Sequence, residues 1–129
     1  MTLEAAEFNF AALLFSMQVE LPRSNLKHKL QLLIGRLSGF RVAGNSMTPT
    51  LTDGTYVLIA PSKQFLAGDI VLANHPFKKS VKILKRIESV TPDGDYFLVG
   101  DNKDESTDSR SFGAVLAKEV FGKAVCRLQ

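Results

Sequence analysis

Lys85 has the sequence setting that most favours chemistry. It lies in residues 81–90, Val-Lys-Ile-Leu-Lys-Arg-Ile-Glu-Ser-Val, where a strand would put it on one face with Val81, Ile83 and Ile87. The other, mostly charged face would carry Lys82, Leu84, Arg86 and Glu88. A lysine amine removed from water loses the solvation of its charged form, so its pKa falls and it can act as a general base. Taken alone, the pattern is more typical of a lysine stem crossing a small apolar patch.

Ser46 is a candidate nucleophile. Residues 44–51 read Gly-Asn-Ser-Met-Thr-Pro-Thr-Leu and follow an expected strand. Gly44 permits a sharp turn and Pro49 prevents regular pairing, so Ser46 could stand exposed at the strand end with its N–H facing an oxyanion. Serine is common in turns, and the segment alone is typical of an ordinary one.

Residues 100–110, Gly-Asp-Asn-Lys-Asp-Glu-Ser-Thr-Asp-Ser-Arg, are rich in carboxylates. They do not fit a calcium loop, because Lys103 takes a ligand position, the central glycine is missing and Phe112 stands where the closing Glu belongs. Asp108 and Arg110 are close enough to pair, and the Ser106 hydroxyl could hold a neutral amine.

Metal and histidine chemistry have little support in the sequence. One cysteine, Cys126, and two histidines, His28 and His75, cannot form a Cys/His metal cluster, so we expect no metal and no cofactor. His75 lies between Asn74 and Pro76 with no carboxylate placed to orient it. This setting favours a loop histidine over a member of a catalytic triad.

Length and charge exclude several classes of protein. A chain of 129 residues is about one domain, and a net charge of +3 without a basic, aromatic-rich stripe argues against nucleic-acid binding. The apolar runs at 10–15 and 30–35 are too short to span a membrane, and no basic region precedes the first. We therefore expect no transmembrane span, no secretory signal and a cytoplasmic location.

The predicted elements give a mostly β fold after an N-terminal helical segment, residues 1–38. One helix is expected over 3–20, ending near Pro22, and a second from Ser24 to Leu37. The second either packs on the body or rests as a basic amphipathic helix on a membrane surface. Residues 39–129 should form a small antiparallel, barrel-like or coiled sheet, with a hairpin turn at 92–95. The expected strands are 40–44, 55–60, 69–73, 81–90, 95–100 and 122–128.

Four segments together resemble the conserved boxes of type I signal peptidases. In order they are 46–51, Gly68-Asp69-Ile70-Val71, Lys85-Arg86 and 100–110, and the match covers about residues 40–125. These enzymes are serine proteases that use a Ser/Lys dyad on a β scaffold. The resemblance implies Ser46 as nucleophile and Lys85 as general base.

The same resemblance implies the supporting roles. Ser106 would orient the Lys85 amine, and the backbone N–H of Ser46 would bind the oxyanion. Some relatives place a serine hydroxyl two residues before the nucleophile, where this chain has Gly44, so a second oxyanion donor is not identified. The loop behind the dyad would be braced by Asp101, Asp108 and Arg110. The substrate contacts would come from Met47 and Pro49.

The chain departs from typical signal peptidases in having no spanning helix and almost no insertion between Lys85-Arg86 and the last box. A small member with Asn74-His75-Pro76-Phe77 and the run 106–113 is similar to the maturation proteases of nickel-type superoxide dismutase. Those remove a short N-terminal leader so that the new N-terminus can bind nickel. The expected partner is then a protein substrate, the dismutase precursor, and any metal belongs to it.

Three alternatives remain open. A general leader peptidase for exported proteins could contact the membrane through residues 26–37. A self-cleaving repressor-type peptidase uses the same chemistry but needs a cleavable bond in its own N-terminal region, where no convincing Ala-Gly or Cys-Gly bond occurs. In a non-catalytic β binding module, Ser46 and Lys85 would be incidental.

Overall fold

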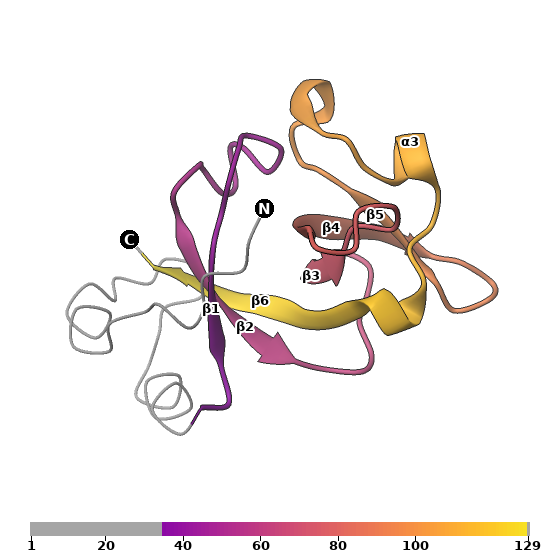
Figure 1. Ribbon diagram of the computed structural model, residues 1–129, viewed down its shortest axis with the longest axis horizontal. Helices are drawn as coiled ribbons and strands as arrows, with labels where there is room; N and C mark the ends of the chain where they lie inside the picture. Colours follow the sequence, from indigo (N-terminus) through magenta and orange to yellow (C-terminus); the bar gives the residue numbers. More distant parts are fainter. Residues whose placement is uncertain (1–34, 129) are drawn as a thin grey trace.

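The computed structural model describes residues 35–128 (Figure 1). The helix predicted for 3–20 lies outside this range. Of the helix predicted for 24–37 only residues 35–37 are described, and they form a turn and a bend before the first strand. Within the described range, no helix is long and apolar enough to cross a membrane.

All six predicted strands are present, displaced by at most a few residues at their ends. They are β1 (Ser38–Arg41), β2 (Tyr56–Pro61), β3 (Ile70–Asn74), β4 (Lys82–Val90), β5 (Tyr96–Val99) and β6 (Val120–Leu128). Three short helical turns, η2 (Lys103–Glu105), α3 (Ser109–Phe112) and η3 (Ala117–Glu119), lie between β5 and β6. The mostly β class is confirmed.

The strands form one antiparallel sheet in the order β1-β2-β6-β3-β4-β5. The C-terminal strand β6 runs through its centre and joins the β1-β2 pair to the β3-β4-β5 group (Figure 1). The sheet is open, with β1 and β5 at its edges, and does not close into the barrel-like form that the sequence suggested. Register shifts in β2, β3 and β4 mark bulges, which increase local twist and bend the sheet.

Turn chemistry explains the hairpin between β4 and β5. The Thr91 N–H donates to the Asp95 carbonyl at 2.8 Å, and the Gly94 N–H donates to the Thr91 carbonyl at 2.9 Å. Gly94 has a φ of +85°, a left-handed conformation that glycine adopts without strain. The turn predicted at 92–95 is confirmed.

Apolar side chains are buried on both faces of β3 and β4. Leu72 and Leu84 belong to one core cluster, whereas Val71 and Ile87 belong to another. Since neighbouring side chains on a strand point to opposite faces, the two clusters lie on opposite sides of the sheet. The face of β4 that we expected to be mostly charged therefore carries a buried Leu84, because the segment after β1 covers it.

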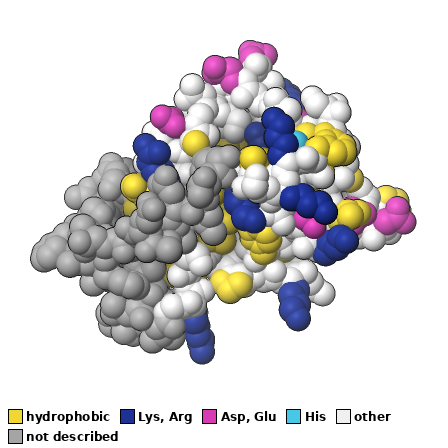
Figure 2. All heavy atoms as spheres, viewed as in Figure 1, with side chains coloured by type: hydrophobic (Ala, Val, Ile, Leu, Met, Phe, Trp, Pro, Cys, Tyr) yellow, Lys and Arg dark blue, Asp and Glu magenta, His cyan; other side chains and the backbone are white. Residues whose placement is uncertain are grey.

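Figure 2 shows how charged side chains are distributed over one face of the molecule. On the face drawn in Figure 2, basic side chains are spread between hydrophobic ones, and acidic side chains lie toward the margins. Most charged side chains visible there are basic, in keeping with the net charge of +3.

The cluster on the Ile87 side should dominate the stability of the β4-β5 hairpin. Leu98 is fully buried there, so we expect Leu98→Ala to lower the free energy of unfolding by about 2–5 kcal/mol through the cavity it leaves. Leu116→Ala, at a side chain 50% exposed, is the matched control and should cost less than about 0.5 kcal/mol. Urea denaturation followed by circular dichroism measures both, and equal losses would contradict this assignment of the core.

Candidate active site

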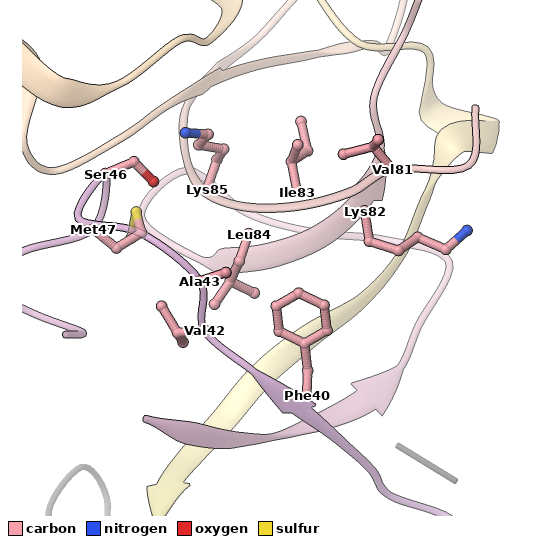
Figure 3. A pocket seen from close by; sticks show the side chains of 10 residues that line it. All are labelled: Phe40, Val42, Ala43, Ser46, Met47, Val81, Lys82, Ile83, Leu84 and Lys85. Carbon is pink, nitrogen blue, oxygen red and sulfur yellow. The ribbon is translucent and has the colours of Figure 1, made fainter. Parts of the chain in front are cut away.

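A mostly apolar pocket lies between the segment that follows β1 and the first half of β4 (Figure 3). On β4 and at Val81 just before it, the side chains of Val81, Ile83 and Lys85 point to one side and those of Lys82 and Leu84 to the other, as the predicted alternation requires. Ser46 and Lys85 lie at the same end of the pocket. Its full lining is Phe40, Val42, Ala43, Ser46, Met47, Val81, Lys82, Ile83, Leu84 and Lys85.

Local structure after β1 explains how Ser46 reaches this pocket. Val42 continues the pairing beyond β1, donating to the Thr55 carbonyl at 2.7 Å. Gly44 then turns the chain with a φ of +82°, and its N–H donates to the Asp53 carboxylate at 2.8 Å. Met47, only 1% exposed, anchors the next turn in the core. Ser46 is left half-buried, with its hydroxyl directed toward the end of the pocket where the Lys85 amine lies (Figure 3).

Lys85 is a buried lysine, and no carboxylate within residues 35–128 forms an ion pair with it. It is 5% exposed, and its Nζ donates to Ser106 Oγ at 3.0 Å. Burial lowers the pKa of the amine from its ordinary value; the nearby Asp108 charge opposes this and that of Arg110 adds to it. The net direction is downward, which favours the neutral amine.

Asp108 orients Ser106 from behind. The Ser106 hydroxyl donates to Asp108 Oδ2 at 2.6 Å, so its lone pairs face the Lys85 amine. The Asp108 carboxylate also accepts from the Gly100 N–H at 2.8 Å and from Arg110 through Nε at 2.9 Å, Nη2 at 2.6 Å and the backbone N–H at 3.1 Å. Burial alone would raise its pKa, but these hydrogen bonds outweigh burial and hold the pKa well below the usual range.

Asp101 forms hydrogen bonds both to β4, the strand that carries Lys85, and to the segment that follows Ser46. Its carboxylate accepts two hydrogen bonds from Arg86, through Nε and Nη2, each at 2.8 Å. It also accepts from Thr50 Oγ1 at 2.5 Å. The hydrogen bond from Arg86 lowers the Asp101 pKa, although burial opposes it. Asp101 is therefore an ionised link between β4 and the segment after Ser46.

Gly100 permits the closest approach of backbone segments at the site. A Cβ at this position would lie 2.2 Å from Ser106 Oγ and 2.6 Å from the Ser46 carbonyl oxygen. Neither contact is sterically allowed, so a side chain here would separate Ser46 from the group that holds Lys85.

The structure brings most of the predicted site residues together. Ser106, Asp108 and Arg110 form a chain of contacts behind Lys85, and Asp101 braces β4. The residues that the sequence marked for this region are Ser46, Lys85, Ser106, Asp101, Asp108 and Arg110.

Of the two predicted substrate contacts, Met47 lines the pocket but is almost wholly buried in the core. Pro49 follows a cis peptide bond, is exposed and is not part of the pocket lining.

Three features of this region were missed from the sequence. They are the close packing at Gly100, the hydrogen bond from Thr50 to Asp101, and the hydrogen bonds of Asn102 to Asn45, Ser46 and Thr48. An asparagine directly after Gly-Asp at a predicted strand end could have suggested a capping or bridging role.

His75 belongs to the loop between β3 and β4. Its Nδ1 accepts from the N–H groups of Phe77 and Lys78, each at 3.1 Å, and its ring lies 5.2 Å from that of Phe112. Burial and the nearby Lys78 and Lys85 charges lower its pKa, so the neutral ring that these contacts require is favoured. Among residues 35–128, no group of three or more His, Cys, Asp or Glu side chains is placed to hold a metal ion.

Comparison with known proteins identifies the class. A family model described as Peptidase S24-like matches residues 4–125. The chain belongs to the Peptidase S24-like family, and its relatives define it further as signal peptidase-like.

Mitochondrial inner membrane protease subunit 1 of Xenopus tropicalis is 33% identical over 109 residues, covering 67% of this chain and 65% of that protein. Signal peptidase I of Buchnera aphidicola is 43% identical over 44 residues, covering 34% of this chain and 14% of the relative. Signal peptidase I of Haemophilus influenzae is 44% identical over 41 residues, covering 32% and 12%. The matches span less than two thirds of the length of each relative.

The ionised Asp108 links stability to pH. Its pKa is depressed in the folded state, so as the pH falls through about 4 the unfolded chain takes up a proton that the folded chain does not. The contribution is complete above the unfolded pKa and is lost at lower pH, with a slope of at most about 1.4 kcal/mol per pH unit.

We expect the unfolding free energy of the wild type, measured by urea titrations, to fall between about pH 5 and 3, and Asp108→Asn to flatten that fall. Asp93→Asn, in the exposed β4-β5 hairpin, is the matched control and should leave that slope in place. A slope unchanged by Asp108→Asn would contradict the ionised, buried carboxylate.

Proposed function

We propose that this chain is a serine endopeptidase in which Ser46 is the nucleophile and Lys85 the general base. The observation that carries the proposal is a buried lysine amine, with its pKa lowered, at the same end of one pocket as an accessible serine hydroxyl. Membership in a peptidase family supports it independently.

The reaction needs one proton carrier. Neutral Lys85 accepts the Ser46 hydroxyl proton as the oxygen attacks the scissile carbonyl, and then gives that proton to the leaving amine. A water molecule then transfers a proton to Lys85 as its oxygen attacks the acyl-enzyme, and Lys85 returns that proton to the departing Ser46 oxygen, which releases the acid product and restores both the serine hydroxyl and the neutral amine. Ser106 holds the amine in place, and the Asp108–Arg110 pair holds Ser106.

The oxyanion of the tetrahedral intermediate would be bound by the backbone N–H of Ser46. Among the described residues, none accepts a hydrogen bond from this N–H. Gly44, two residues earlier, contributes no side-chain donor. The Ser46 N–H is therefore the donor that we assign.

The pairing of β4 suggests how a peptide binds. Residues 82–86 of β4 pair with β3 on one edge, whereas β5 pairs with β4 only from Arg86 onward. The other edge of residues 82–85 faces the pocket and the segment after β1. We propose that an extended substrate adds to this edge and places an apolar side chain in the pocket, with its scissile bond at Ser46.

Substitution of either member of the dyad should abolish cleavage. Ser46→Ala removes the nucleophile and Lys85→Ala the base, and each should lower kcat/KM at least about a thousandfold. Because Lys85→Ala removes a poorly solvated amine and not a packing anchor, the fold should persist, as circular dichroism can verify. Ser80→Ala and Lys79→Ala, at exposed positions, are the matched controls. Retained cleavage in either dyad variant would refute the assignment.

The activity should follow the ionisation of Lys85. Only the neutral amine can accept the Ser46 proton, so kcat/KM should rise with pH and level off once Lys85 is deprotonated. Its pKa is lowered by burial, so the inflection should lie below the ordinary lysine value of about 10.4. Measuring kcat/KM from about pH 5 to 11 tests this, and an inflection at or above the ordinary value would contradict a dry amine.

The proposed substrate is the N-terminal leader of a precursor protein, specifically the nickel-type superoxide dismutase precursor, cleaved in the cytoplasm. Support comes from the short connection between Lys85-Arg86 and the last box and from the segments 74–77 and 106–113. A general signal peptidase acting on exported precursors is the second candidate, supported by the similarity to Signal peptidase I.

Incubation with each type of precursor, followed by mass measurement of the new N-terminus, distinguishes these substrates. Cleavage of the dismutase precursor alone supports the maturation role, and cleavage of secretory precursors alone supports the alternative. A chain that shortens itself without added substrate, seen by intact mass, would indicate the self-cleaving type. Absence of any cleavage would favour a binding module.

A further inference from the structure

Asn102 joins the Ser46 turn to the Lys85 site through both its backbone and its side chain. Its N–H donates to the Ser46 carbonyl at 2.9 Å. Its side-chain Nδ2 donates to the Asn45 carbonyl at 3.1 Å and to Thr48 Oγ1 at 2.8 Å. Asn102 is thus hydrogen-bonded to Asn45, Ser46 and Thr48, three residues at and around the serine.

The chemistry of the partners fixes the orientation of the Asn102 amide. The Asn45 carbonyl and the Glu105 carboxylate, whose Oε2 lies 3.0 Å from Nδ2, can only accept hydrogen bonds. The NH₂ group must therefore face them. An oxygen in its place would meet a carbonyl and a carboxylate, and both contacts would become repulsive.

The turn that Asn102 holds has weak bonds of its own. Within it, the Thr48 N–H donates to the Asn45 carbonyl at 3.2 Å and Thr48 Oγ1 donates to the same carbonyl at 2.9 Å. The Asn45 carbonyl thus accepts from both Thr48 and Asn102. The Thr48 hydroxyl donates to that carbonyl and accepts from the Asn102 amide. Loss of the Asn102 side-chain amide would leave the turn held by these bonds, by the backbone N–H of residue 102 on the Ser46 carbonyl, and by the Leu51 N–H, which donates to the Met47 carbonyl at 2.8 Å.

The segment that contains Asn102 also contacts Lys85 and its neighbour on β4. Asn102 directly precedes η2, and Ser106, which binds the Lys85 amine, directly follows it. Asp101, on the other side of Asn102, is bonded to Arg86, the neighbour of Lys85 on β4. The segment 100–106 therefore contacts both members of the proposed dyad, and Asn102 is its contact with the serine turn.

We propose that Asn102 is a positioning residue that fixes the Ser46 turn relative to Lys85 and Ser106. It touches neither the reacting atoms nor the substrate pocket and acts through the backbone of Asn45 and Ser46. The inference rests on the proposed peptidase function for its kinetic consequence, but its structural consequence is independent of activity.

Asn102→Asp is the sharpest variant, because it keeps the size and the backbone N–H of the residue and replaces the donating NH₂ by oxygen. Asp104→Asn is the matched control: it makes the reverse exchange two residues away, at an exposed side chain. Displacement of a reacting group by about 1 Å can cost about a hundredfold in rate. We expect Asn102→Asp to lower kcat about 10- to 100-fold with KM within about twofold, and Asp104→Asn to change neither.

The pH profile separates positioning of the serine from a general disturbance of the site. Asn102 does not contact Lys85, so the inflection of kcat/KM should stay at its wild-type pH in Asn102→Ala, which removes the amide without adding a charge near Lys85. A shifted inflection, or a loss of activity matched by a rise in KM alone, would contradict the proposed role.

Thr48→Val provides a second, independent route, since it removes the hydroxyl that receives the Asn102 amide. If both residues act through one turn, the double variant Thr48→Val/Asn102→Ala should lose less activity than the product of the two single losses. Fully multiplicative losses would overturn the shared mechanism. This pair keeps the proposal testable even if Asn102→Asp folds poorly.

Hydrogen exchange provides the readout that does not depend on catalysis. We expect amides in a peptide covering residues 44–51 to exchange about five- to tenfold faster in Asn102→Asp than in the wild type, with Asp104→Asn unchanged. Unchanged exchange would overturn the proposal even if the enzyme is active. Persistent cleavage by Ser46→Ala would instead overturn the proposed function, so the two failures are distinguishable.

Discussion

The site depends on the burial of the Lys85 amine, which is unfavourable for the charged form of the group because it removes the amine from water. A lysine in a protein interior is tolerated as a cation only with a charged partner close by, and here the Lys85 amine donates to the neutral hydroxyl of Ser106. The carboxylate of Asp108 is one hydrogen bond further away and is already occupied by Arg110. This separation keeps the ionised carboxylate from fully stabilising the ammonium form, while still fixing the direction of the hydroxyl that holds the amine.

The rest of the architecture brings a serine to that amine. β6 lies between β2 and β3, so it joins the strands that lead to Ser46 with those that carry Lys85. The segment beginning at Gly100 then packs between them so closely that no side chain fits at its first residue. Hydrogen bonds of Asp101 and Asn102 hold the two halves together where the sheet itself does not, because the first half of β4 has no strand partner on its pocket edge among the described residues.

Local chemistry made much of the fold predictable. Alternation placed Lys85 with Val81 and Ile83 on one side of β4, and the Pro-Asp-Gly run marked the following hairpin, because each is decided by neighbours within a few residues. The burial of Leu84 could not be read in the same way, since it depends on a segment about forty residues earlier that covers that face. The choice between a barrel-like and an open, coiled sheet could not be made from the sequence for the same reason, because closure is decided by bulges and by the packing of whole strands.

For this protein, the sequence alone determined the strands, the hairpin and the residue types of a serine and lysine site, because alternation, turn propensity and motif order are written along the chain. Only the tertiary structure decided that Lys85 is dry, that Asp108 reaches it only through Ser106, and that Asn102 holds the serine turn. Those properties come from contacts between segments that lie about twenty to sixty residues apart in the sequence. Desolvation and hydrogen-bond geometry act through space, so no local pattern encodes them.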